Sequence, residues 1–253
     1  YDVNTNTNTM VAWSWKAGGS ASSNSNGSIT SSVSASTDAG FSIVSYTGTG
    51  SDANVGHGLS SAPELIITKS RSTTGDWKVH TSAIDGSWDV GTLNSTSAFG
   101  NSSYTAPTSS IFYVGSGAPT NASSVTYVSY LLHSVKGYSK FGSYTGNGSL
   151  DAPFIHLGFK PAWLMIKRTD TTNSWVMFDN KRNAFNVVDK HLFANTTDPE
   201  DSSANYNEVD FLSNGFKLRE DNNTINASGG TYIFMAFAEL PFVNSSGIPN
   251  NAR

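Results

Sequence analysis

The sequence predicts an all-β protein made of two tandem β-sandwich repeats with a jelly-roll-like arrangement of strands. Three observations lead to this fold class. Short bursts of aromatic and β-branched residues recur along the whole chain, Ser, Thr, Asn and Gly separate them, and one set of motifs occurs twice at a nearly constant offset. Regularly spaced short strands with turn residues between them are typical of sandwiches.

The composition separates this chain from a disordered one. Ser (40), Thr (25), Asn (24) and Gly (23) together make up 112 of the 253 residues, and apolar residues account for only 37%. A disordered chain is poor in aromatic residues, whereas Phe, Trp and Tyr reach 12% here. The small polar residues are therefore expected in turns and at the solvent-facing positions of strands.

The repeat sets the domain organisation. Residues 46–51 (Tyr-Thr-Gly-Thr-Gly-Ser) reappear as residues 144–149 (Tyr-Thr-Gly-Asn-Gly-Ser), an offset of 98. Residues 121–127 match residues 226–232 with an offset of 105, so the second copy contains about seven more residues, which are expected in a loop. The sequence predicts one sandwich over residues 40–136 and a second, with a C-terminal tail, over residues 137–253.

Residues 1–39 are expected to hold the terminal strand of a preceding unit, a linker and a first strand. Residues 9–16 align with residues 126–133 and are the expected terminal strand, so the polypeptide is expected to continue N-terminally. Residues 18–28, rich in Ser, Asn and Gly, form either a linker or the exposed end of a hairpin.

Within each unit the apolar pattern predicts strands in the same places. In the first unit these are the alternating residues from Phe41, the short run at residues 65–67 and the alternation from Trp77. In the second unit the matching runs are residues 163–166 and 175–178. The glycines that follow the repeated Tyr-Thr predict a tight turn or a bulge.

The spacing of apolar residues predicts one short helix. Phe185, Val188 and Leu192 recur at helical intervals within residues 183–192. This segment lies in the part of the second unit that contains the extra residues.

Charge and cysteine content exclude several classes of function. Charged residues make up only 13% of the chain, with a formal net charge of −4, so there is no basic surface for nucleic acid. The longest apolar stretches, such as residues 232–238, are too short to span a bilayer. The absence of cysteine excludes disulfides, thiol catalysis and cysteine-based metal sites.

The sequence contains no recognisable catalytic or metal-binding pattern. The five histidines lack metal-ligand spacing, although His57 and His156 lie near equivalent points of the repeat. The acidic residues 198–201 form either a solvated loop or a calcium site, and the former is favoured because no calcium-loop pattern is present. The carboxylates considered for glycoside hydrolysis do not recur in both units; in the first unit they are Glu64, Asp76, Asp85 and Asp89. No catalytic residue, metal or cofactor is expected.

Aromatic side chains in loops are the candidates for ligand binding. Trp88, Tyr104 and Tyr206 lie in predicted loops rather than in the repeated strands. Exposed aromatic rings can bind sugars, although a packing role for these three residues is the competing interpretation.

Several motifs together resemble a known viral family. They are residues 11–19, 39–50 and 57–59 in the first part of the chain, and residues 142–148, 211–219 and 232–239 in the second. This set resembles a repeated β-rich domain of unassigned function in structural proteins, of the tail-fibre or appendage type, of marine and cyanobacterial tailed bacteriophages. Ser14 stands where members of that family often carry a cysteine.

The resemblance implies a virion protein rather than an enzyme. The expected protein is the C-terminal part of a phage fibre or surface appendage, located on the virion surface and serving host attachment or particle assembly. Its expected partners are other copies of the chain, with a trimer favoured, and other virion proteins. The alternative is a carbohydrate-binding module that recognises a polysaccharide of the host surface. Neither nucleic-acid binding nor membrane insertion is expected.

Overall fold

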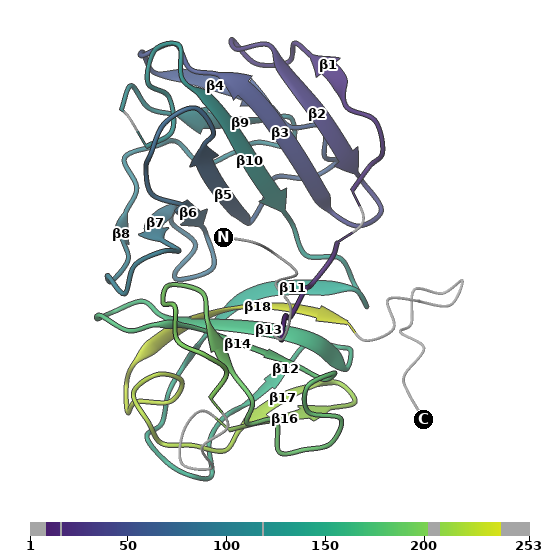
Figure 1. Ribbon diagram of the computed structural model, residues 1–253, viewed down its shortest axis with the longest axis vertical. Coiled ribbons are helices and arrows are strands. Elements are labelled where there is room, and N and C mark those ends of the chain that lie inside the picture. The colour runs from purple at the N-terminus through teal and green to yellow at the C-terminus, as the bar shows by residue number, and fades with distance from the viewer. Residues whose placement is uncertain (1–8, 16, 118, 202–207, 239–253) are drawn as a thin grey trace.

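The structure, a computed structural model, describes residues 9–15, 17–117, 119–201 and 208–238. In these ranges all regular structure is β, arranged as two sandwiches, which confirms the predicted fold class. Figure 1 shows the first sandwich above the second. No helix in the same ranges meets the length and hydropathy needed to cross a membrane.

The first sandwich combines an eight-stranded sheet with a two-stranded sheet. The large sheet is antiparallel, in the order β1-β2-β3-β10-β5-β6-β7-β8. Its strands are β1 (Ser22–Asn24), β2 (Ser31–Ser36), β3 (Phe41–Thr47), β5 (Leu65–Ser70), β6 (Lys78–Thr81), β7 (Asp89–Thr92), β8 (Gly100–Asn101) and β10 (Thr126–Leu132). The small sheet consists of β4 (Ala53–Gly56) and β9 (Ile111–Val114), and side chains of the two sheets share one apolar core.

The second sandwich combines five strands with three. The larger sheet has the order β11-β18-β13-β14-β15, and the smaller one has the order β12-β17-β16. The strands are β11 (Ser139–Thr145), β12 (Phe154–His156), β13 (Pro161–Arg168), β14 (Trp175–Asp179), β15 (Leu192–Phe193), β16 (Val209–Leu212), β17 (Gly215–Leu218) and β18 (Thr231–Ala238).

The two sandwiches have the same strand order over most of their large sheets. The series β3-β10-β5-β6-β7 in the first corresponds to β11-β18-β13-β14-β15 in the second. In the first sandwich β2 and β1 extend the sheet beyond β3. β10 of the first sandwich is followed directly by the short segment 133–138 and then by β11. No described strand therefore extends the second large sheet beyond β11. The internal repeat of the sequence is therefore a repeat of strand order.

A buried asparagine holds the repeated glycine turn in each sandwich. Asn121 Oδ1 accepts a hydrogen bond from the Thr49 backbone N–H at 2.8 Å, and its amide donates to the Ser51 carbonyl at 2.6 Å. Asn226 Oδ1 accepts from the Asn147 backbone N–H at 2.9 Å in the same way. Because both asparagines are fully buried, these bonds supply polar partners that water does not reach.

A glycine without space for a side chain and a pair of stacked tyrosines also shape these turns. A Cβ on Gly48 would lie 2.2 Å from the Ala122 carbonyl oxygen, so no side chain fits there. Below the turn, the rings of Tyr46 and Tyr127 stack with centroids 5.3 Å apart. The hydroxyl of Tyr127 accepts a hydrogen bond from the Ala122 backbone N–H at 2.8 Å. The second sandwich repeats the stack with Tyr144 and Tyr232, 5.0 Å apart.

Among the described residues three apolar clusters are buried: one inside each sandwich and one between them. The cluster between the sandwiches draws residues from both large sheets: Leu65, Val79, Leu132, Phe141, Trp163, Met165, Trp175, Ile233, Met235 and Phe237. Alternation along β18 explains how one strand serves two clusters. Phe234 faces the interior of the second sandwich, whereas Met235 faces the first sandwich. Residues 232–238 are therefore apolar almost throughout.

The contact between the sandwiches also includes polar bonds and a cavity. The indole of Trp175 donates to the Thr92 carbonyl at 3.0 Å, and the Lys167 ammonium donates to the Thr96 carbonyl at 3.2 Å. Burial lowers the pKa of Lys167 to about 8. A mostly apolar cavity of about 430 Å³ lies beside these contacts, among residues of both large sheets, Trp13 and Trp15.

The N-terminal segment differs from its prediction. Residues 9–15 do not form the expected strand, because their side chains pack on the second sandwich and their backbone joins no sheet. The Trp13 indole donates to Asp179 Oδ2 at 3.2 Å, and the Arg182 guanidinium lies 5.7 Å from the centre of the Trp13 ring. The ring of Trp15 meets that of Trp163 edge-on at 5.3 Å.

The helix predicted over residues 183–192 is wrong. The segment is irregular up to β15, and Val188 forms an isolated β-bridge with Val209. Val188 is buried in the core of the second sandwich, whereas the Phe185 side chain is 87% exposed. A helix would place these two side chains on one face. The helical spacing in the sequence is therefore coincidental.

Candidate functional site

The strands β4 and β9 form the outer sheet of the first sandwich, and their side chains alternate between its core and its outer surface. Val55, Phe112 and Val114 are buried in the core. Asn54 and Tyr113 lie opposite each other in the strand register, at intervening positions. Their side chains therefore face outward, and an amide and a phenol lie side by side on the surface.

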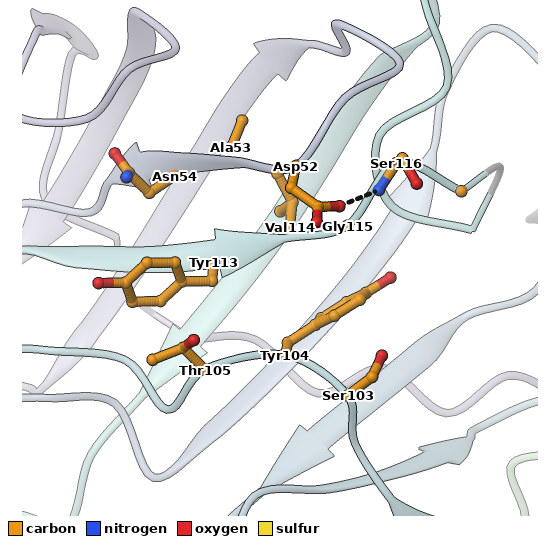
Figure 2. A pocket seen from close by; sticks show the side chains of 11 residues that line it. Asp52, Ala53, Asn54, Ser103, Tyr104, Thr105, Tyr113, Val114, Gly115 and Ser116 are labelled. Carbon is orange, nitrogen blue, oxygen red and sulfur yellow. Dashed lines mark hydrogen bonds between the residues drawn. The ribbon is translucent and has the colours of Figure 1, made fainter.

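A polar groove of about 640 Å³ lies on this outer surface. It is formed by the two strands, the loop that follows β8 and the turn that follows β9. Figure 2 shows the residues that line it, which are Asp52, Ala53, Asn54, Ser103, Tyr104, Thr105, Tyr113, Val114, Gly115, Ser116 and Gly117. Hydroxyl groups and backbone polar atoms make up much of the lining, and it contains the aromatic rings of Tyr104 and Tyr113.

Tyr104 forms a fixed wall of the groove. Its ring stacks on His80 with the centroids 5.1 Å apart, and its hydroxyl shares a hydrogen bond of 3.0 Å with Thr120 Oγ1. Gly115 makes this packing feasible, because a Cβ there would lie only 2.4 Å from Cε1 of Tyr104. The ring is held in place before any ligand arrives, which lowers the entropic cost of binding.

Asp52 and Asn54 are oriented by backbone hydrogen bonds. Asp52 Oδ1 accepts from the Ser116 N–H at 2.8 Å, the dashed line in Figure 2. Asn54 Oδ1 accepts from the Ser28 N–H at 2.8 Å. Oδ2 of Asp52 and Nδ2 of Asn54 are therefore the atoms that these side chains offer to a ligand, one as an acceptor and the other as a donor.

The electrostatics of the groove disfavour anions. Asp52 is the charged side chain of the lining, which contains no Lys, Arg or His among the residues described. Burial, and secondly the charge of Lys78, lower the pKa of His80 to about 4, so the ring beneath Tyr104 is neutral at pH 7. Neutral groups with hydroxyl donors and acceptors fit this lining best.

The structure places the predicted aromatic residues in different surroundings. Tyr104 lines the groove. Trp88 is only 8% exposed and packs in the core of the first sandwich, in agreement with the competing packing interpretation. Tyr206 lies outside the described residues. Sequence reasoning missed Tyr113, although the alternation of Phe112, Tyr113 and Val114 was a signal that its side chain faces outward.

The carboxylates considered for glycoside hydrolysis do not meet in the groove. They are Glu64, Asp76, Asp85 and Asp89, and none of the four lines it. Hydrogen bonds from Ser87 lower the pKa of Asp85. Burial, and secondly the nearby charge of Asp85, raise the pKa of Asp89. Neither carboxylate belongs to the groove lining.

The acidic loop of the second unit makes ion pairs. Glu200 contacts Arg182 at 3.0 Å and Lys190 at 3.6 Å. Across the described ranges, no three His, Cys, Asp or Glu side chains are grouped so that they could hold a metal ion. Glu200 is thus engaged with neighbouring cations.

The two histidines near equivalent points of the repeat have different environments. His57 is buried, Nε2 lies 3.1 Å from the Thr108 carbonyl, and Nδ1 accepts a hydrogen bond from the Leu59 N–H at 3.1 Å. Burial lowers its pKa. His156 is exposed on β12. Their near-equivalent positions in the repeat therefore do not give the two histidines a common environment.

These features define an all-β protein of two fused sandwiches, with a polar groove on the outer sheet of the first. A family model described as "Domain of unknown function (DUF7483)" matches residues 1–241, and the chain belongs to this family. No curated protein and no solved structure matches the chain in the corresponding comparisons.

Proposed function

We propose that this protein is a non-enzymatic structural protein of a virion, the C-terminal part of a bacteriophage fibre or surface appendage. Its role is host attachment or particle assembly at the virion surface. The motifs that resemble repeated domains of phage structural proteins motivate this proposal. The extensive apolar contact between the two sandwiches is the structural observation that supports it most.

That contact suits a module that must hold its two sandwiches in a fixed orientation. Seven buried apolar residues of the second large sheet and three of the first meet in one cluster. Hydrogen bonds from Trp175 and Lys167 to backbone carbonyls of the first sandwich add to this contact. Domains in flexible tandem arrays share smaller and more polar contacts. A rigid pair of sandwiches transmits orientation from one end to the other, as a particle appendage requires.

Electron microscopy of intact particles tests the location. Immunogold labelling with antibodies raised against this chain is expected to decorate an appendage of virions purified from an infected culture. Label confined to the soluble fraction of the lysate, with particles unlabelled, would rule the proposal out. Light scattering on the full-length protein is expected to give the mass of a homo-oligomer, with three copies favoured.

The second candidate function is a carbohydrate-binding module for a host surface polysaccharide. The groove favours it, because a fixed tyrosine ring, a carboxylate, an amide and hydroxyl groups line one open surface. This function is compatible with a place on the virion. Binding of the full-length protein to a glycan array tests it, and absence of binding to every glycan would contradict it.

A further inference from the structure

We propose that the groove of the first sandwich is a site for uncharged saccharides, with Tyr113 as the stacking platform and Asp52 and Asn54 as the hydrogen-bonding pair. This inference rests on the second proposal above, carbohydrate binding, and assigns it to one surface. It also predicts that the second sandwich has no such site.

Tyr113 is suited to stacking because strand geometry presents it outward. Its neighbours Phe112 and Val114 are buried at 2% and 3% exposure, so the strand is anchored from below. Its hydroxyl makes no hydrogen bond with any residue that the structure describes. Figure 2 shows the ring projecting from β9 with Thr105 beside it. A sugar ring presents C–H groups to such a face, and the phenol hydroxyl stays available to its hydroxyls.

Asp52 precedes β4 and Asn54 is its second residue, so the two side chains lie on either side of Ala53 in the groove lining. The backbone N–H groups of Ser116 and Ser28 fix one oxygen of each side chain. The remaining carboxylate oxygen and amide nitrogen form an acceptor and a donor on one side of the groove. Adjacent hydroxyls of a sugar, each both donor and acceptor, match this pair.

The charge of the lining selects uncharged saccharides. Asp52 is the charged group in the lining, where no Lys, Arg or His is present among the described residues. A sulfate or carboxylate on a sugar would meet the Asp52 charge without a compensating cation. Electrostatic repulsion would therefore weaken the binding of acidic glycans.

The corresponding surface of the second sandwich has different chemistry. In the strand register, Phe154 lies opposite Lys217 on β12 and β17, where the first sandwich has Asn54 opposite Tyr113. Lys217 Nζ makes a 2.7 Å ion pair with Asp151. At this register position the second surface therefore has neither the outward phenol nor the neutral donor, although the strands pair antiparallel in both small sheets.

Titration of the full-length protein with oligosaccharides tests the site. The probes are neutral hexasaccharides of glucose, galactose and mannose, together with sulfated and sialylated oligosaccharides. We expect at least one neutral probe to bind, and we expect acidic counterparts to bind at least about tenfold more weakly. The Tyr113→Ala variant should weaken neutral binding by about tenfold or more, whereas Tyr113→Phe should retain most of it because the ring remains.

Phe154→Ala is the matched control, since it removes an aromatic ring at an outward position of the second sandwich. Its affinity should equal that of the unaltered protein, and thermal unfolding should show that each variant is folded. Neutral binding that survives Tyr113→Ala would overturn this site while leaving carbohydrate binding intact. Stronger binding of acidic probes would overturn the predicted selectivity, and no binding of any glycan would overturn both proposals.

Discussion

In each sandwich one buried asparagine side chain holds the repeated glycine turn in place. Asn226 makes hydrogen bonds with the Asn147 N–H, the Ser149 carbonyl and the Glu220 carbonyl while it is fully buried. One side-chain amide thus ties the turn at residues 147–149 to the segment at Glu220. Loss of one side chain leaves several buried groups without partners, and the cost of each is about 1–3 kcal/mol.

Asn226→Ala is therefore expected to lower the free energy of unfolding by about 3 kcal/mol or more. Chemical denaturation followed by tryptophan fluorescence measures this change. Asn101→Ala, at an exposed asparagine of β8 without a side-chain hydrogen bond among the described residues, is the control and should change stability by less than about 0.5 kcal/mol. Equal effects of the two substitutions would contradict the role of the turn.

His80 is expected to make stability depend on pH. Its folded-state pKa of about 4 is below the ordinary value of 6.5, so between these values the unfolded state binds a proton that the folded state does not. The contribution of neutral His80 to the free energy of unfolding is complete above pH 6.5 and is lost as the pH falls towards 4. At about 1.4 kcal/mol per pKa unit, the total loss is about 3 kcal/mol.

His80→Phe removes this titration and keeps a ring between Trp88 and Tyr104. Denaturation midpoints measured from pH 7 to pH 4 should fall less steeply for the variant than for the unaltered protein. The exposed His156, replaced by Gln, should leave the slope unchanged. An identical slope for the His80 variant would show that this histidine is not the origin of the acid sensitivity.

At the scale of elements, the N-terminal segment connects the two sandwiches without forming a strand. Its Trp13 ring contacts Asp179, Arg182 and Trp163 of the second sandwich, and the chain then continues into β1 of the first. The segment therefore covers the junction between the sandwiches.

Trp13→Ala should lower the free energy of unfolding by about 2 kcal/mol, below the range for a fully buried tryptophan because the ring is only half-buried. Differential scanning calorimetry measures the loss. Trp13→Phe should recover part of it, since packing returns while the hydrogen bond to Asp179 does not. Met10→Ala, at a residue that is 55% exposed, should have little effect.

Sequence patterns predicted strands better than they predicted the surroundings of individual side chains. The strands around Ile66 and Ile166 follow from short apolar runs, and the repeat indicated that they are equivalent. The predicted helix failed because Val188 is buried by a distant partner, Val209, rather than by its own neighbours. Local spacing carries no information about such long-range pairing.

The candidate site was predictable only in part. Tyr104 was identified as an aromatic residue in a loop, and it lines the groove. Trp88 has the same sequence signature, but its ring is buried because it stacks beside His80 in the first core. Tyr113 lies in a strand and was passed over, since its outward orientation depends on which neighbours fill the core.

At the scale of the whole molecule, the apolar cluster between the sandwiches should make them unfold together. Met235→Lys places a charge at a buried position of that cluster, which is costly without a partner. Calorimetry is expected to show one transition for the unaltered protein and two for the variant. Ser213→Lys, in the exposed turn between β16 and β17, adds the same charge and should keep one transition. A single transition in both variants would indicate that another contact couples the sandwiches.

The placement of Trp13 determines which contacts would first resist a force applied at the N-terminal end of the described chain. A pull on the chain at residue 9 reaches Trp13 before any strand, and Trp13 is held by the sandwich that is later in sequence. Trp15 packs on Trp163 as well, so both rings bear tension before β1 does. Tension would first detach the indole from Asp179 and Trp163, and only then load β1 and the large sheet that follows it.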